Sequence, residues 1–244
     1  MTAGSGVDGA RYELQLGPLE ASECEQSALI HQSTLGMEFL ARFGPGFLAA
    51  YHRAWVRSPC GLALAARDRQ GRLVGVMLGS LDPASHYKSM LAQSGPKLAA
   101  RMVASAATRP RLAYELAVTR SGRYSRALLR HLRARFTLDR GGAGTPSAPS
   151  ADSGFRIGEI THLMVDPAVQ RSGAGRALVD RTVELARSAG LDKLVLVTPP
   201  DMAARRFYDA LGWTAGSELT SRSGETFVSY SLPLSGGSSG ASGS

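Results

Sequence analysis

The apolar and polar positions of the first 80 residues follow strand and helix periods in turn. An alternating stretch near the start predicts a half-buried strand, and apolar residues three and four apart then predict two amphipathic helices. Ser22 is the expected cap of the first helix. Two apolar runs around a polar turn predict an antiparallel hairpin. The predicted elements are a strand at 12–16, helices at 20–34 and about 47–55, and hairpin strands at 61–66 and 73–80.

A second series of elements begins near Arg156. Its predicted order is a strand at 156–165, a loop, a helix, a strand at 193–197, a further helix and a final strand. Between the two series, residues 83–140 predict a helical insertion. It consists of stretches at 85–109 and 112–136 that are interrupted at Pro96 and Pro110, because proline cannot donate a helical hydrogen bond.

The most informative segment is the junction between a strand and a helix at residues 165–178. There the chain leaves an apolar strand, passes through a loop with Gly173 and Gly175, and enters an amphipathic helix. The first N–H groups of a helix and its dipole point at one spot, which suits a phosphate group. Glycine lets the backbone approach a bulky anion because it has no Cβ. This junction therefore predicts a cofactor that carries a pyrophosphate.

Two common phosphate loops do not fit the junction. A P-loop needs G-x-x-x-x-G-K followed by Ser or Thr, and that string does not occur in the sequence. A dinucleotide fingerprint needs a third glycine where this chain has Leu178. The string Gln170-x-x-Gly173-x-Gly175 instead resembles the acyl-CoA loop of the GNAT family of N-acetyltransferases, R/Q-x-x-G-x-G/A.

Residues 201–213 are similar to a second signature of that family, N-x-x-A-x-x-x-Y-x-x-x-G-F. Ala204, Tyr208 and Gly212 match at the expected offsets. Asp201 stands where the family has Asn, and Trp213 stands where it has Phe. The aromatic exchange is mild, whereas Asp201 places a negative charge near the expected cofactor.

The resemblance covers residues 156–232 and implies a fold as well as an activity. The implied fold class is α/β (α+β), the GNAT fold, with a mixed, mostly antiparallel sheet of about six or seven strands flanked by helices. We expect one domain over residues 11–234, which includes the insertion at 83–140 and a disordered loop at 141–154. The ends, 1–10 and 235–244, are expected to be flexible.

The implied activity is that of an acyl-CoA-dependent N-acyltransferase. Acetyl-CoA, or another acyl-CoA, would be the co-substrate, and a primary amine of a small molecule or protein would attack the thioester directly. The alternative is a non-catalytic GNAT-like protein that binds CoA, nucleic acid or a partner through the arginine-rich insertion.

Two residues are predicted to carry the proton transfers. Tyr208 corresponds to the family tyrosine that meets the CoA sulfur, which makes it the general acid. Glu159 lies eleven residues before Gln170, at the spacing of the base glutamate in the histone-acetylating branch of the family. A carboxylate in a half-buried strand has a raised pKa, which suits a base. Strand alternation puts Glu159 and His162, the competing base, on opposite faces.

The expected cofactor contacts are mainly backbone groups. The strand segment Leu163, Met164 and Val165 should splay from its neighbour and bind the pantetheine arm, while the Met164 or Val165 N–H polarises the thioester. The loop amides should hold the pyrophosphate, with Arg171 and Arg176 adding charge. The predicted cofactor-binding residues are Leu163, Met164, Val165, Gln170, Arg171, Ser172, Gly173, Ala174, Gly175, Arg176 and Asp201.

The net charge of +8 is concentrated in one region. Residues 97–140 hold eleven basic residues against Glu115 and Asp139, so this segment carries +9 and the rest of the chain sums to −1. Arginines at 123, 126, 130 and 133 share one helical stripe, opposite an apolar stripe at 128, 132 and 136. The arginine stripe is either a solvated face or a surface for an acidic partner such as nucleic acid.

Several classes of protein are disfavoured by composition. No run of 18 apolar residues predicts a membrane span, and residues 1–10 do not resemble a secretory signal. Cys24 and Cys60 are expected to be free thiols of a cytoplasmic protein. The sequence has no Cys/His cluster at zinc-ligand spacing and no H-E-x-x-H, so no metal is expected. A homodimer is possible, since members of the family often pair.

Overall fold

Seven strands form one sheet in the order β1-β2-β3-β4-β5-β7-β6. Only the β4–β5 pair is parallel, and the other neighbours are antiparallel. The predicted mixed, mostly antiparallel sheet is therefore confirmed. The strands are β1 (Gln15–Pro18), β2 (Gly61–Arg67), β3 (Leu73–Ser80), β4 (Ile157–Val165), β5 (Lys193–Thr198), β6 (Thr214–Thr220) and β7 (Thr226–Pro233).

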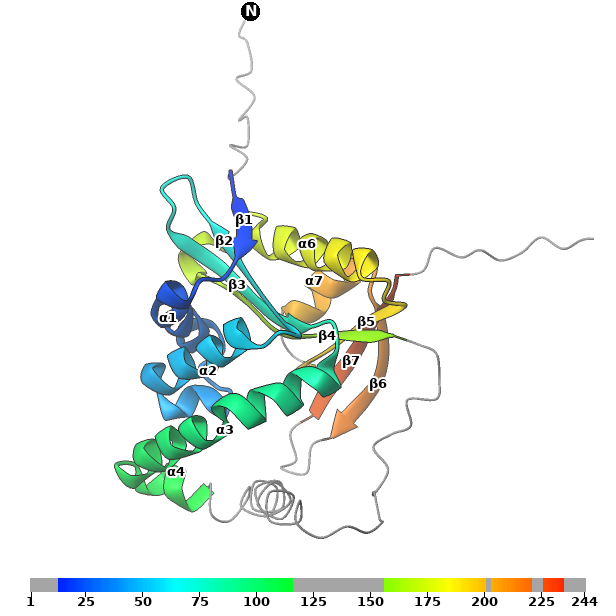
Figure 1. Ribbon diagram of the computed structural model, residues 1–244. Helices are drawn as coiled ribbons and strands as arrows, with labels where there is room; N and C mark the ends of the chain where they lie inside the picture. Colours follow the sequence, from blue (N-terminus) through cyan, green and yellow to red (C-terminus); the bar gives the residue numbers. More distant parts are fainter. Residues whose placement is uncertain (1–12, 116–155, 201–202, 221–225, 235–244) are drawn as a thin grey trace, which may run out of the picture.

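The computed structural model describes residues 13–115, 156–200, 203–220 and 226–234 (Figure 1). The arginine stripe at 123–133, the loop at 141–154, both chain ends and Asp201 lie outside these residues. Among the described helices, none is long and apolar enough to cross a membrane.

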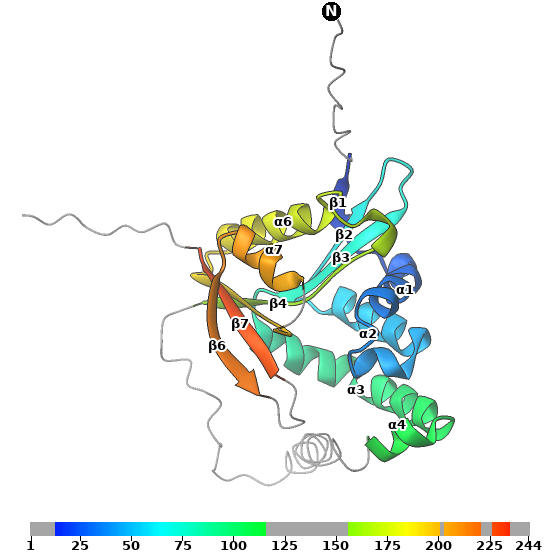
Figure 2. The same cartoon turned by 180° about the vertical axis from the view of Figure 1, so that it is seen from behind.

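Helices cover both faces of the sheet. The helices α1, α2 and α3 lie on one side, and α6 and α7 lie on the other, as the two opposite views show (Figures 1 and 2). The α-helices are α1 (Cys24–Thr34), α2 (Pro45–Arg57), α3 (Pro83–Ala107), α4 (Pro110–Glu115), α6 (Ala174–Ser188) and α7 (Ala204–Ala210). Short 3₁₀ turns occur as η1 (Ala21–Glu23), η2 (Leu40–Phe43) and η4 (Pro167–Val169).

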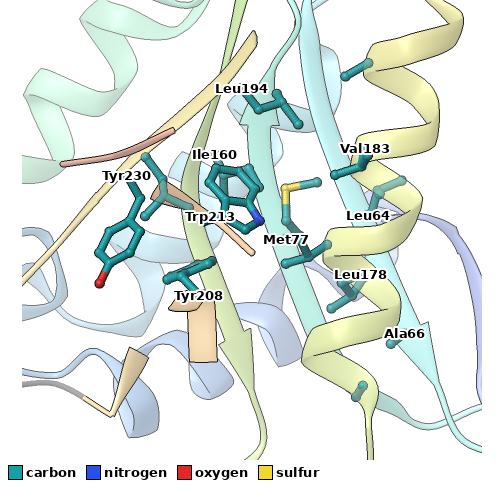
Figure 3. Close-up of a cluster of buried hydrophobic side chains, with 14 of the residues drawn as sticks. Leu64, Ala66, Met77, Ile160, Leu178, Val183, Leu194, Tyr208, Trp213 and Tyr230 are labelled. Atoms are coloured by element: carbon teal, nitrogen blue, oxygen red, sulfur yellow. The ribbon is translucent and has the colours of Figure 1, made fainter. Parts of the chain in front are cut away.

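Each face of the sheet has its own hydrophobic core. The core under α6 and α7 contains Leu178, Leu194 and Trp213 (Figure 3). The core under α1, α2 and α3 contains Trp55 and Met164. Alternation along the strands sends successive side chains to the two cores, so the sheet needs helices on both sides.

Two local predictions about the helices were wrong. Ser22 does not cap α1, because the Glu20 N–H donates to Glu23 Oε2 (2.8 Å) in a capping box one turn earlier. Pro96 does not interrupt the insertion helix, since α3 runs unbroken through it. Tyr87, Met90, Leu98 and Met102 pack on the α1–α3 core from both sides of Pro96 and hold the helix together despite the lost hydrogen bond. Cys24 and Cys60 are free thiols, as expected.

Strand β4 contains one extra residue relative to β3. Leu78 pairs with His162 and Gly79 pairs with Ile160, so Thr161 has no counterpart on β3. Such a β-bulge reverses the alternation of side chains beyond it. Accordingly, Ile160 points into the α6–α7 core, whereas Met164 points into the α1–α3 core.

Gly79 permits this bulge because the two backbones approach closely there. A Cβ on Gly79 would lie 2.5 Å from the Glu159 carbonyl oxygen. Gly79→Ala is therefore expected to lower the free energy of unfolding by about 1–3 kcal/mol, as overpacking typically does. Urea denaturation measures the loss. Gly46→Ala is the control, because nothing lies within 4 Å of a Cβ there, and equal stability of the two variants would contradict the close approach.

Candidate active site

Strands β4 and β5 separate part-way along their length. They pair only at Ile157–Lys193, Gly158–Leu194 and Glu159–Val195. Beyond that point β5 stays with β7 as far as Thr198–Val228, and β4 stays with β3 as far as Val165–Gly75. The edge of β4 at residues 160–165 thus faces an opening. Backbone groups on such an edge need partners, and the amides of an extended ligand can supply them.

The opening leads to the amino end of α6. After β4, the Asp166 carboxylate accepts a hydrogen bond from the Ala168 N–H (2.9 Å), which shapes the turn η4. The backbone then adopts left-handed conformations at Arg171 (φ 67°) and Gly173 (φ 90°), and Gly173 is the N-cap of α6. Nothing lies within 4 Å of a Cβ built on Gly173. A helix N-terminus with free space above it is a place where an anion fits.

One arginine of this loop has an acidic partner. Arg176 Nε lies 3.5 Å from Asp180 Oδ2, and both side chains are more than half exposed. An exposed ion pair of this kind adds little to stability. The Asp180 carboxylate offsets part of the charge that Arg176 would offer to an anion.

Helix α7 lies against the same junction. A Cβ on Gly175 would lie 3.5 Å from Val165 Cγ2 and 3.6 Å from Phe207 Cζ, so the end of β4, the start of α6 and α7 converge. Tyr208 follows Phe207 and is buried beside Trp213 and Tyr230. Burial raises the pKa of Tyr208, so its hydroxyl keeps its proton at neutral pH.

The expected orientation of Glu159 and His162 on opposite faces was wrong. The bulge at Thr161 brings both to the α1–α3 side. His162 packs against the rings of Tyr51 and His31, and Glu159 interacts with Tyr87 of α3. The two candidate bases therefore share one face, which simple strand alternation could not show.

The surroundings of Glu159 raise the pKa of its carboxyl group. Burial raises its pKa, while the nearby His162 and a hydrogen bond from Tyr87 lower it in part. The side chain borders a cleft of about 400 Å³ on the face of β5 opposite the α6–α7 core. The cleft is lined by Glu159, Lys193, Val195, Leu196, Val197, Gly216, Ser229, Tyr230 and Ser231.

A buried polar network that sequence reasoning missed adjoins this face. Ser27 Oγ lies 2.7 Å from His52 Nδ1, and His52 Nε2 lies 3.0 Å from His31 Nδ1. His31 Nε2 and His162 Nε2 each lie 3.3 Å from Glu38 Oε2. Burial would raise the pKa of Glu38, but hydrogen bonds from the two histidines lower it to about 2. The members come from α1, the following loop, α2 and β4, so no local spacing pattern marks them.

Comparison with known proteins finds a likeness to one family. A sequence profile described as the acetyltransferase (GNAT) family matches residues 134–213, which include the splayed β4, the glycine loop, α6 and α7. The match covers about a third of the chain. Among curated proteins, the chain is 43% identical over 58 residues to the mycothiol acetyltransferase of Beutenbergia cavernae. That match covers 23% of this chain and only 20% of the length of that relative.

Solved structures confirm the GNAT fold. The ribosomal-protein-S18-alanine N-acetyltransferase of Escherichia coli superposes with a TM-score of 0.52 at 13% identity, over 93% of this chain and 97% of its own. A chimera of the spermidine N-acetyltransferase SpeG of Vibrio cholerae gives 0.54 at 11% identity, over 91% and 95%. The yncA protein of Salmonella typhimurium, solved with its cofactor acetyl-CoA, gives 0.50 at 14% identity, over 93% and 96%.

Proposed function

We propose that this protein is an N-acetyltransferase that moves an acetyl group from acetyl-CoA to a primary amine. The observation that carries the proposal is the opening between β4 and β5 beside the glycine N-cap of α6. A strand edge with free backbone groups suits the pantetheine amides, and the helix N-terminus suits the diphosphate. The match of residues 134–213 to the acetyltransferase (GNAT) family supports the same reaction class.

The cofactor is held mainly by main-chain atoms. The N–H groups from Gln170 to Arg176 bind the diphosphate, and the edge of β4 from Leu163 to Val165 binds the pantetheine arm. Asp201 is retained as a cofactor contact on the family resemblance. This arrangement delivers the thioester to the opening beside Glu159 and α7.

The reaction is a direct transfer. The amine nitrogen attacks the thioester carbonyl carbon, and the oxygen that gains charge accepts a hydrogen bond from the Met164 or Val165 N–H. The C–S bond then breaks, Glu159 takes the proton from the amine, and Tyr208 gives a proton to the thiolate. Solvent returns the proton from Glu159 to Tyr208, so the products are the amide and free CoA.

The cleft beside Glu159 is the proposed acceptor site. Its walls are mostly small, neutral side chains, with Lys193 as the cation that borders it. Val197 is 53% exposed there and offers an apolar surface. The cleft therefore suits the amine-bearing end of a small molecule or of a protein segment.

A titration and a turnover assay test this function together. Isothermal titration calorimetry with acetyl-CoA measures the cofactor site, and thiol release over a panel of primary amines measures transfer. Saturable binding with release of free CoA by at least one amine is expected. Binding without turnover on any amine would favour the non-catalytic alternative, and no binding of acetyl-CoA would end the proposal.

Glu159→Gln is expected to change the pH dependence of the reaction. The base acts in its ionised form, so wild-type kcat/KM falls about tenfold per pH unit below the raised pKa of Glu159. The variant has lower kcat/KM at neutral pH and a flat acid limb. A pH–rate profile from pH 5 to 9 measures this. Glu184→Gln on α6, which pairs with Arg181 at the surface, is the control, and an unaltered profile in Glu159→Gln would remove Glu159 from the base role.

A further inference from the structure

Three side chains with metal-ligating atoms meet beside β4. They are His31 at the end of α1, Glu38 in the loop before η2, and His162 on β4. His31 Nε2 and His162 Nε2 are each 3.3 Å from Glu38 Oε2, and the three atoms lie within 4.8 Å of one another. His31 and His162 are buried, while the Glu38 side chain is 41% exposed, so the group is accessible from one side.

The two separations from Glu38 Oε2 match the ligand spacing around a small divalent metal ion. Zinc bonds to histidine nitrogen and carboxylate oxygen are about 2.0–2.2 Å long, and tetrahedral ligands at that distance lie about 3.3–3.5 Å from each other. Two imidazoles and one carboxylate form a common three-ligand zinc set that leaves the fourth position open. Imidazole also selects zinc-like transition metals over magnesium or calcium.

The surroundings of His31 orient it as a ligand. A metal-bound histidine presents the lone pair of one ring nitrogen and donates from the other. With His31 Nε2 as the ligand atom, its Nδ1–H donates to His52 Nε2 (3.0 Å), and His52 Nδ1–H donates to Ser27 Oγ (2.7 Å). A serine hydroxyl accepts as readily as it donates, so this chain of bonds accommodates the required tautomers.

We propose that His31, Glu38 and His162 form a binding site for a divalent transition-metal ion, with zinc as the best match. The bound ion ties the loop after α1 to β4 and keeps one coordination position for water or a substrate atom. This site is separate from the cofactor loop, and the proposal does not depend on acetyl transfer. The proposal contradicts the sequence-based expectation of no metal. That expectation relied on local ligand spacing, whereas these three residues come from segments far apart in the chain.

The full chain, stripped with a chelator and dialysed, provides the test. Isothermal titration with zinc chloride should give one saturable site per chain, and a thermal scan should show a higher Tm with zinc than without it. Cobalt(II) at the same site should give the intense visible absorption of a tetrahedral complex. Glu38→Gln keeps the shape of the side chain but removes the charged ligand, and we expect it to weaken zinc binding at least about 100-fold.

Matched variants separate a metal site from a hydrogen-bonded network. Glu25→Gln on α1 alters an 81% exposed glutamate outside the cluster and should leave zinc affinity unchanged. His162→Asn should lose the site as Glu38→Gln does. The proposal would be overturned if the wild-type protein showed no saturable zinc binding. It would also be overturned if zinc binding persisted in both Glu38→Gln and His162→Asn, because the ion would then be held by Cys24, Cys60 or another group. Acetyl-CoA titration of the same samples keeps this outcome distinct from a failure of the proposed acetyltransferase function.

Discussion

Gly173→Val is expected to weaken acetyl-CoA binding at least about 100-fold. Gly173 has a φ of 90° and caps α6, with open space where a Cβ would project. We propose that the diphosphate of acetyl-CoA occupies this space, so a branched side chain would displace it from the loop amides. Losing two charge-assisted hydrogen bonds, each about 1.5–3 kcal/mol, corresponds to a loss of that size. Calorimetric titration with acetyl-CoA measures the affinity.

Gly71→Val separates this effect from backbone strain. Gly71 lies in the turn between β2 and β3, has a φ of 76°, and also has no atom within 4 Å of a Cβ. Both variants should lose stability, because an L-residue in a left-handed conformation costs about 1–2 kcal/mol. Only Gly173→Val should lose the cofactor. If the two variants bind acetyl-CoA equally well, the loop at 170–176 does not hold the diphosphate.

Tyr208→Phe is expected to lower kcat by about 10²–10⁴-fold while KM for acetyl-CoA changes little. The hydroxyl is proposed to act only when the thiolate leaves, so its loss affects the transition state more than the bound ground state. Burial raises the pKa of Tyr208 and keeps the proton available at neutral pH. Steady-state kinetics with the best amine of the panel measures both constants.

Tyr114→Phe on α4 is the control for removal of a tyrosine hydroxyl. Tyr114 is 67% exposed and lies outside the proposed acceptor cleft. This variant should keep the wild-type kcat and stability. A normal kcat in Tyr208→Phe, or equal losses in both variants, would assign the phenol to the core rather than to catalysis.

Local sequence patterns predicted most of the elements correctly. The hairpin at 61–80, the helix after Pro45 and the strand at 193–198 form where apolar periodicity and turn residues indicate them. The glycine loop could also be predicted from the sequence. Its strand, short loop and helix N-terminus lie within about 14 residues, so the prediction uses only positions that are close together in the chain. The family resemblance drawn from these residues is confirmed.

Predictions that depended on contacts between distant segments were less successful. Pro96 was expected to interrupt the helical stretch. The observed helix α3 continues through Pro96, because residues on both sides of it pack against the core. Glu159 and His162 were assigned to opposite faces, because the bulge at Thr161 arises only when β4 pairs with β3. Register between strands is set by the partner strand and by both cores, and neither is present in a local window of sequence.

The sequence by itself determined the strand–loop–helix junction at 165–178, the alternation that forms the sheet, and the candidate residues Glu159, Tyr208 and Gly173. Each of these depends on a local conformational preference or on spacing along the chain. The tertiary structure alone decided the separation of β4 from β5, the shared face of the two candidate bases, and the meeting of His31, Glu38 and His162. These features follow from how remote segments pack, since burial and pairing energies act between residues that the sequence keeps far apart.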